Sequence, residues 1–135
     1  MTGKVFLVGA GPGDPELMTL KAVKALTLAD VVLVDDLVNT AVLEHCQQAR
    51  VVFVGKRGGC KSTPQDFINR MLIALAGQGQ KVVRLKGGDP FLFGRGGEEM
   101  LALRAAGVDC EVIPGITSGI AVPAGLGVPV THRAF

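Results

Sequence analysis

A glycine-rich stretch near the start of the chain has the composition of a loop that binds a small ligand. Gly9-Ala10-Gly11-Pro12-Gly13-Asp14-Pro15 follows the apolar run Val5–Val8. The pattern predicts a buried strand, then a turn, then a helix that Asp14 caps and that begins at Pro15. Backbone N–H groups and the positive end of the helix would face a ligand there. A plain structural turn is the alternative, but the glycines at 9, 11 and 13 exceed what one turn requires.

The same stretch comes close to the dinucleotide-binding fingerprint G-x-G-x-x-G. Gly9 and Gly11 fit it, whereas Asp14 occupies the position of the third glycine. Pro12 stiffens the loop and removes one donor N–H. These residues favour a small ligand lying across the edge of the loop. They argue against a nicotinamide-dependent dehydrogenase, which is kept as an alternative of a different class.

A second near match lies at Gly55–Ser62, which reads G-K-R-G-G-C-K-S. The phosphate-binding loop G-x-x-x-x-G-K-[ST] needs a glycine where Cys60 stands, because the backbone there lies close to the phosphates. An ATPase or GTPase loop at this place would also leave the other polar clusters of the chain without a role. The stretch therefore argues against a nucleotide hydrolase.

Polar clusters follow four other valine-rich runs of the chain. They are Asp35-Asp36, Gly55-Lys56-Arg57-Gly58-Gly59, Lys86-Gly87-Gly88-Asp89-Pro90 and Pro114-Gly115-Ile116-Thr117-Ser118. The carboxyl ends of parallel strands meet at one edge of a sheet, so we expect all five clusters to form one site. The acid at 35 or 36 could hold a ribose, act as a base or pair with a cationic ligand. Because side chains alternate along a strand, only one of the two can face the cleft.

The elements that must position these clusters are strands alternating with helices. The expected strands are Val5–Val8, Val31–Val34, Val51–Val54, Lys81–Leu85 and Cys110–Ile113. The first three are apolar throughout, which is typical of parallel strands buried on both faces. The fold class is therefore α/β, a five-stranded, mainly parallel sheet with helices on both faces.

Three helical patterns separate the strands. Leu17, Leu20, Val23 and Leu26 recur at helical spacing, and a second pattern begins after Thr63-Pro64 and stops at Gly77. A third helix is expected over 97–106. Acidic Glu98 and Glu99 occupy its first turn, Arg104 its last turn and Gly107 its C-terminal cap, which suits the helix dipole.

Composition narrows the possible classes of function. Apolar residues make up 48% of the 135 residues, yet no run approaches the ~18 residues of a membrane span. The net charge of +2 is too small to indicate nucleic acid. Cys46, Cys60 and Cys110 form no C-x-x-C pair, which indicates small buried positions in a reducing cytosol. With no signal peptide in the first residues, we expect a cytoplasmic protein of one domain.

The last segment, 119–135, predicts a short helix that runs into an exposed connection. It contains Pro123, Gly125, Gly127 and Pro129 and ends with Thr131-His132-Arg133-Ala134-Phe135. No closing element follows it, so we expect a second domain after this chain.

Several of these stretches together resemble the tetrapyrrole methylase family. They are Gly9–Asp14, Asp35–Val38, Val54–Arg57, Val83–Phe91, Phe93–Glu99, Pro114–Thr117 and Thr131–Arg133. The resemblance runs over the whole chain and implies two α/β domains with a cleft between them, of which 1–135 is the amino-terminal one. It also implies a homodimer in full-length form. The implied reaction is transfer of methyl groups from S-adenosylmethionine to uroporphyrinogen III, giving precorrin-2 on the route to sirohaem and cobalamin.

The resemblance also assigns roles to particular residues. Asp35 falls on the family's proposed proton acceptor and Lys56 on its proposed proton donor. The positions that bind the methyl donor are Pro12, Gly87, Gly88, Asp89, Leu92, Thr117 and Ser118. The substrate carries carboxylates, for which Arg57, Arg95, His132 and Arg133 are candidate contacts. An electron-rich pyrrole carbon attacks the methyl group in line, so positioning does most of the work and no metal is required.

Three rival interpretations stay open. A later precorrin methyltransferase, a diphthine synthase or a ribosomal RNA methyltransferase would share the fold, although Phe93–Glu99 favours action on uroporphyrinogen III. The dehydrogenase belongs to a different class. The third possibility is a folding unit that is catalytically silent by itself, because half of the cleft would be absent.

Overall fold

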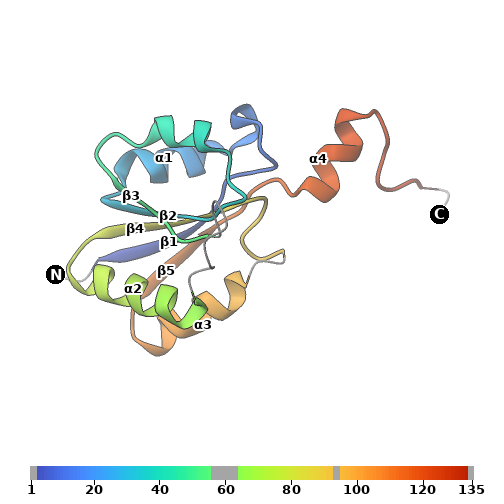
Figure 1. Ribbon diagram of the computed structural model, residues 1–135. Coiled ribbons are helices and arrows are strands. Elements are labelled where there is room, and N and C mark those ends of the chain that lie inside the picture. The colour runs from blue at the N-terminus through green and yellow to red at the C-terminus, as the bar shows by residue number, and fades with distance from the viewer. Residues whose placement is uncertain (1–2, 56–63, 93–94, 134–135) are drawn as a thin grey trace.

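Five parallel strands form one sheet in the spatial order β3-β2-β4-β1-β5 (Figure 1). The computed structural model describes residues 3–55, 64–92 and 95–133. The strands are β1 Lys4–Gly9, β2 Val31–Val34, β3 Arg50–Phe53, β4 Lys81–Lys86 and β5 Asp109–Ile113. Every pairing between these described strands is parallel, which confirms the α/β class and the five-stranded sheet.

Helices cover both faces of the sheet, as the sequence predicts (Figure 1). Helix α1 (Leu20–Leu28) and the 3-10 segment η2 (Thr40–His45) lie on one face, and α2 (Gln65–Gly77) and α3 (Gly96–Ala105) lie on the other. Two cores result. One contains Val8, Leu26, Val34 and Leu85 on the α1 side, and the other contains Leu7, Leu33, Leu72 and Leu103 on the side of α2 and α3.

The strand register brings the polar clusters to one edge. Val8 pairs with Leu85 and with Ile113, and Leu85 pairs with Val34, so these four residues form one row across the sheet. The chain leaves each strand just beyond this row. Asp35, Lys86 and Gly9 therefore emerge side by side, at the edge where ligands bind in open α/β sheets.

The entry to the first helix differs from the prediction. Asp14 caps only a one-turn 3-10 helix, η1 (Pro15–Leu17), and its Oδ1 accepts from Glu16 N over 2.9 Å. Met18 is extended, and α1 begins after Thr19, whose Oγ1 accepts from Ala22 N over 3.1 Å. The predicted cap at Asp14 and the helical start at Pro15 are therefore confirmed, but the helix stops after one turn, and the α-helix begins at a second cap five residues later.

The buried side of α1 contains two alanines and one leucine. Ala22, Ala25 and Leu26 are buried, whereas Leu20 is 89% exposed. The spacing of the apolar residues indicated a helix correctly, although of the four only Leu26 is fully buried. Small alanines form the contact with the sheet, since they allow a close approach of α1 to β1.

The burial expected for the third strand is also corrected. Strand β3 is an edge strand, so it is only partly buried and Phe53 is 45% exposed, against the expectation of burial on both faces. The predicted stop of the second helix at Gly77 is confirmed, since Gly77 is the last residue of α2, and Gly79, with φ of 82°, turns the chain. The features predicted for α3 are confirmed: Glu98 and Glu99 in the first turn, Arg104 in the last and Gly107 at φ of 75° beyond it.

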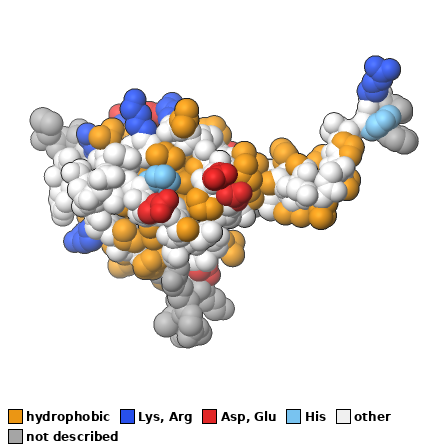
Figure 2. Space-filling view, turned by 90° about the horizontal axis from the view of Figure 1, so that it is seen from above, with side chains coloured by type: hydrophobic (Ala, Val, Ile, Leu, Met, Phe, Trp, Pro, Cys, Tyr) orange, Lys and Arg blue, Asp and Glu red, His pale blue; other side chains and the backbone are white. Residues whose placement is uncertain are grey.

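The helix α4 (Ser118–Gly125) extends away from the body of the molecule (Figures 1 and 2). None of its residues is buried, and Ile120, Val122 and Leu126 expose more than half of their surface. The expected short helix leading into an exposed connection is confirmed. Among the described residues, none of the helices has the length and apolar character needed to cross a membrane.

Candidate functional site

The turns that follow β1 and β4 are joined by their backbones. Gly11 N donates to Gly88 O over 3.2 Å, and Gly88 N donates to Gly11 O over 2.8 Å. Gly88 has φ of 64°, a conformation that favours glycine. From the sequence, the N–H groups of the first turn are expected to face a ligand. For Gly11 this is wrong, because Gly88 of the other turn takes up its N–H.

The turn that follows β5 approaches the same place. A Cβ atom on Gly9 would lie 2.8 Å from Gly115 N and closer still to Gly88 O, so no side chain fits at position 9. Asp89 ties the turns together. Its Oδ1 accepts from Phe91 N over 2.8 Å, and its Oδ2 accepts from Gly115 N over 3.1 Å. Both carboxylate oxygens of Asp89 therefore hold backbone.

The three turns and the end of β2 enclose a cleft of about 370 Å³, which we call the glycine cleft. It is lined by Gly11, Pro12, Asp35, Leu37, Lys86, Gly87, Gly88, Asp89, Leu92, Thr117 and Ser118. All of the residues that the resemblance assigned to donor binding are in this list. Leu37 is 84% exposed and lies over Gly87, where a Cβ atom would be 3.4 Å from the Leu37 Cβ. Small-molecule sites occupy roughly 300–1,000 Å³, so the size fits a ligand of that class.

A second cleft of about 590 Å³ adjoins the first, and we call it the charged cleft. It is lined by Asp35, Asp36, Val54, Gly55, Pro64, Gln65, Ile68, Arg84, Lys86 and Arg95. Asp35 and Lys86 line both clefts, so the two spaces meet at these side chains. Both acids of the pair line the charged cleft, and Asp35 alone of the two also reaches the glycine cleft.

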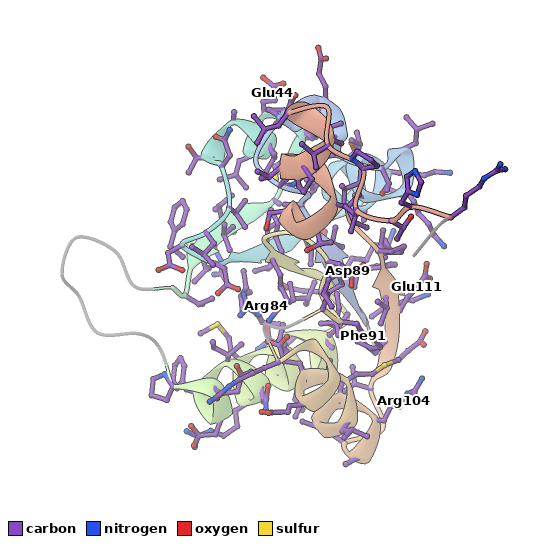
Figure 3. The ribbon with its side chains drawn as sticks, turned by 90° about the vertical axis from the view of Figure 1, so that its right-hand side faces the viewer. Glu44, Arg84, Asp89, Phe91, Arg104 and Glu111 are labelled. Atoms are coloured by element: carbon purple, nitrogen blue, oxygen red, sulfur yellow. The ribbon has the colours of Figure 1, made fainter. Side chains whose placement is uncertain are left out.

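A buried network of charges lies beneath the charged cleft. Arg84 and Lys86 stand on the same side of β4, facing α2 and α3, where Figure 3 shows Arg84 between the sheet and these helices. Arg84 Nε donates to Glu99 Oε2 over 2.8 Å, and its second terminal nitrogen, Nη2, donates to Asp35 Oδ1 over 3.1 Å. Lys86 Nζ donates to Glu99 Oε1 over 2.9 Å. Glu99 thus binds two cations at once.

The electrostatics of Glu99 follow from this position. Its side chain has no exposed surface, and burial by itself favours the protonated carboxyl. The charges of Arg84 and Lys86 and their hydrogen bonds outweigh burial and lower the pKa of Glu99 below its ordinary value. Glu99 is therefore ionised at neutral pH and compensates the two buried cations.

The remaining predicted residues are less well placed. Arg95 lines the charged cleft from the position before α3, with a left-handed φ of 63°. His132 and Arg133 are exposed on the segment beyond α4, and they line neither of the two clefts. Lys56 and Arg57, the expected proton donor and a candidate carboxylate contact, lie outside the described residues.

Three residues of this site, Arg84, Lys86 and Glu99, were not predicted from the sequence to interact. A signal was present. Two cations that alternate with apolar residues in the second half of a central strand are buried, and a buried charge requires a partner. A second missed link is Asn39, whose Nδ2 donates to Gly13 O over 2.8 Å and so joins the end of β2 to the first turn.

The site can bind a small polar ligand against backbone and can present a carboxylate to it. The glycine cleft offers glycine backbone, the side chains of Thr117 and Ser118, and the carboxylate of Asp35. No group of three or more His, Cys, Asp or Glu side chains within 3–55, 64–92 and 95–133 could hold a metal ion. The arrangement suits group transfer between two bound molecules, one in each cleft.

Several known proteins are similar to this chain in sequence and in structure. Uroporphyrinogen-III C-methyltransferase of Pseudomonas aeruginosa is 64% identical over 135 residues, which are 100% of this chain and 55% of that protein. A crystal structure of uroporphyrin-III C-methyltransferase from Thermus thermophilus superposes with a TM-score of 0.88 at 53% identity, covering 98% of this chain and 56% of that one.

Another structure of the Thermus thermophilus enzyme is a complex with S-adenosylhomocysteine, with a TM-score of 0.82, 52% identity and coverage of 97% and 54%. The chain therefore spans about half the length of the relatives that it matches. The family model described as Tetrapyrrole (Corrin/Porphyrin) Methylases matches residues 4–135. Because that match extends over nearly the whole sequence, the chain belongs to the tetrapyrrole methylases.

Proposed function

We propose that this chain is the donor-binding half of an S-adenosylmethionine-dependent uroporphyrinogen-III C-methyltransferase. The observation that carries the proposal is the convergence of Pro12, Gly87–Asp89, Leu92 and Thr117-Ser118 on one cleft of about 370 Å³. The Thermus thermophilus relative, crystallised with S-adenosylhomocysteine, supports the same class of ligand. When bound, S-adenosylmethionine would supply an electrophilic methyl group.

The protein's own residues would hold and orient the two reactants. Thr117, Ser118 and the glycine backbone of 87–88 would bind the donor, and Asp89 would keep the turns in place. The tetrapyrrole would lie over the charged cleft, where Arg95 offers a cation to its carboxylates. In this scheme Asp35, shared by both clefts, accepts a proton from the substrate and Lys56 donates one.

The domain arrangement is part of the same proposal. The curated relatives are almost twice as long as this chain, and α4 exposes apolar side chains beside its end. Residues 1–135 would be the amino-terminal domain, with a second domain closing the glycine cleft and a homodimer as the full-length form. We further propose that the full-length enzyme is cytoplasmic, acts on a small-molecule substrate and binds neither nucleic acid nor a membrane. The isolated chain is then not expected to transfer methyl groups.

A titration followed by NMR tests donor binding. S-adenosylhomocysteine should shift the amide signals of Gly87, Gly88 and Thr117 of the 135-residue chain. Loss of about half the contacts would remove some 3–4 kcal/mol, so the dissociation constant should lie two to three decades above that of a complete site. Gly87→Ala should weaken binding further, since its methyl group enters the cleft without backbone strain.

The control for this substitution is Gly97→Ala. Gly97 lies in α3, has open space around its Cβ position and lines neither cleft. The Gly97→Ala variant should bind S-adenosylhomocysteine with the same dissociation constant as the wild type. If NADH or ATP shifted these amides and S-adenosylhomocysteine did not, a nucleotide-binding function would replace the methyltransferase proposal. Formation of precorrin-2 by the 135-residue chain alone would contradict the need for a second domain.

A further inference from the structure

The buried charges beneath the charged cleft form a chain that ends at Asp35. Lys86, Glu99, Arg84 and Asp35 alternate in sign and are joined by contacts of 2.9, 2.8 and 3.1 Å. The first three side chains are at most 4% exposed, whereas that of Asp35 is 27% exposed. A fully buried network therefore terminates on the one carboxylate that reaches both clefts.

Stability alone does not account for this network. Apolar residues in place of a buried ion pair are often equally stable or more so, and the neighbours of Arg84 along β4 are apolar. Nη1 of Arg84 is also buried without a hydrogen-bond partner among the residues that the structure describes, which costs free energy. Arrangements that give up stability in this way are expected at functional sites.

The geometry fixes one oxygen of Asp35. The guanidinium of Arg84 is planar and rigid, so the hydrogen bond from Nε to Glu99 sets the direction in which Nη2 points. Nη2 donates to Oδ1 of Asp35. Within the described parts of the chain, Oδ2 of Asp35 accepts no hydrogen bond, and it is the oxygen left for a ligand.

We propose that Glu99 and Arg84 are positioning residues for Asp35: Glu99 orients the guanidinium of Arg84, which holds Oδ1 of Asp35 and presents Oδ2 to the substrate. The inference rests on the proposed function, in which Asp35 takes a substrate proton. Oδ2 would receive that proton, and the electron pair of the broken bond would stay on the substrate. A misplacement of about 1 Å can cost 100-fold in rate, so the orientation of this oxygen matters.

The first test measures the orientation of Asp35 directly in the 135-residue chain. Three-bond couplings between Hα and Hβ report its χ1 rotamer, and wild type should show a single rotamer. Arg84→Lys keeps the positive charge but cannot bridge two carboxylates in a fixed plane, so the couplings should become averaged. Arg70→Lys is the matched control, because Arg70 is exposed on α2 and pairs only with Asp66 among the described residues. Unchanged Asp35 couplings in Arg84→Lys would overturn the proposal.

The second test measures turnover in the full-length protein that carries this chain. Glu99→Gln should lower kcat by about 10- to 100-fold and leave the KM for S-adenosylmethionine unchanged, because Glu99 lines neither cleft. A Glu99→Gln enzyme with wild-type kcat would contradict the inference. If Glu99→Gln does not fold, Arg84→Lys gives the same measurement with the buried charge retained.

The two tests also separate this inference from the proposed function. If the wild-type protein does not transfer methyl groups but its Asp35 couplings depend on Arg84, the proposed methyltransferase function is refuted. The positioning of Asp35 by Arg84 then still stands. If the wild type is active but Arg84→Lys leaves the Asp35 couplings unchanged and Glu99→Gln leaves kcat unchanged, only the positioning role of Arg84 and Glu99 is refuted.

Discussion

Gly115 donates its backbone N–H to Oδ2 of Asp89 over 3.1 Å, although 26 residues separate them. The other oxygen of the same carboxylate accepts from Phe91 N, so Asp89 holds its own turn and the turn after β5 together. Thr117 and Ser118, which line the glycine cleft, follow directly after this contact. The shape of the cleft therefore depends on one carboxylate that uses both oxygens on backbone.

The first prediction concerns this carboxylate. Asp89→Ala should lower the free energy of unfolding by about 1–3 kcal/mol, because the half-buried N–H of Gly115 and the exposed N–H of Phe91 lose a charged acceptor. Amide hydrogen exchange should accelerate at Gly115 and Phe91. Asp89→Asn is the matched control, since its single amide oxygen can accept only one of the two bonds and should protect one amide. Protection of both amides in Asp89→Ala would show that the turns are held in another way.

The second prediction uses two glycines with opposite surroundings. Gly9→Ala should destabilise the chain by about 3 kcal/mol, because its methyl group overlaps the backbone of Gly88 and Gly115. Gly97→Ala should stabilise it by about 0.5–1 kcal/mol, since Gly97 is exposed in a helix with nothing near its Cβ position. Urea unfolding of both variants measures the two effects. If Gly9→Ala were as stable to urea as Gly97→Ala, the turns that contain Gly88 and Gly115 would have to move apart at little cost in free energy.

The third prediction is a pH dependence centred on Glu99. Its pKa in the folded chain lies below the ordinary value of 4.5, so its contribution to stability is complete above pH 4.5 and is lost as the pH falls through the folded value. Glu99→Gln should cost about 3 kcal/mol at pH 7, because Arg84 and Lys86 lose their shared anion. The difference from wild type should shrink below pH 4.5, as measured by urea unfolding.

Two variants control this experiment. Glu111→Gln also removes a carboxylate whose pKa is lowered, in this case by hydrogen bonds from Lys21 and Lys4, but that carboxylate is 31% exposed and should contribute less than about 1 kcal/mol. Lys86→Met combined with Glu99→Gln keeps the buried charge balanced and should cost less than Glu99→Gln alone. A pH-independent difference for Glu99→Gln would refute its role as the buried anion.

The strands and the placement of the turns could be predicted because their causes are local. Apolar valine runs such as Val31–Val34 bury on both faces, and parallel strands bring their carboxyl ends together. The same reasoning placed the turns that line the glycine cleft at one edge of the sheet, whereas Leu92, which lies outside these clusters, was assigned by the resemblance alone. The helix α3 was predicted to within one residue at each end, because its charged first and last turns and Gly107 mark these ends in the sequence.

Features that depend on pairing between distant segments could not be predicted. The exposure of Phe53 follows from β3 being an edge strand, which depends on strand order and not on the composition of the run. The hydrogen bond from Gly11 N to Gly88 O likewise forms only because β4 lies beside β1. The hydrogen bond from Arg84 to Glu99 forms only because α3 covers β4. The residue types show that the Gly11 N–H and the Arg84 guanidinium need hydrogen-bond partners, but the fold decides which residues these partners are.

The fourth prediction concerns the cysteines. Burial raises the pKa of the Cys110 thiol to about 11, and burial also raises the pKa of Cys46. At pH 8 only about one molecule in a thousand then carries the Cys110 thiolate, so alkylation by iodoacetamide should be far slower than in the urea-unfolded chain. Mass spectrometry of the tryptic peptides follows each site separately. Alkylation of Cys110 at the unfolded rate would show that β5 opens readily.

The last prediction concerns the stability of α4. None of its residues, 118–125, is buried in this chain, and Pro123 lies inside the helix. A helix of eight residues is marginal in water without tertiary packing, so its amides should exchange within seconds while those of β1 and β4 stay protected. Helix α1 is the control, because it is of similar length but packs Ala22 and Leu26 against the sheet. The second domain proposed above would cover Ile120 and Val122, so this proposal predicts slower exchange of α4 in the full-length protein. Protection of α4 equal to that of α1 in the 135-residue chain would show that the helix is stable without any partner.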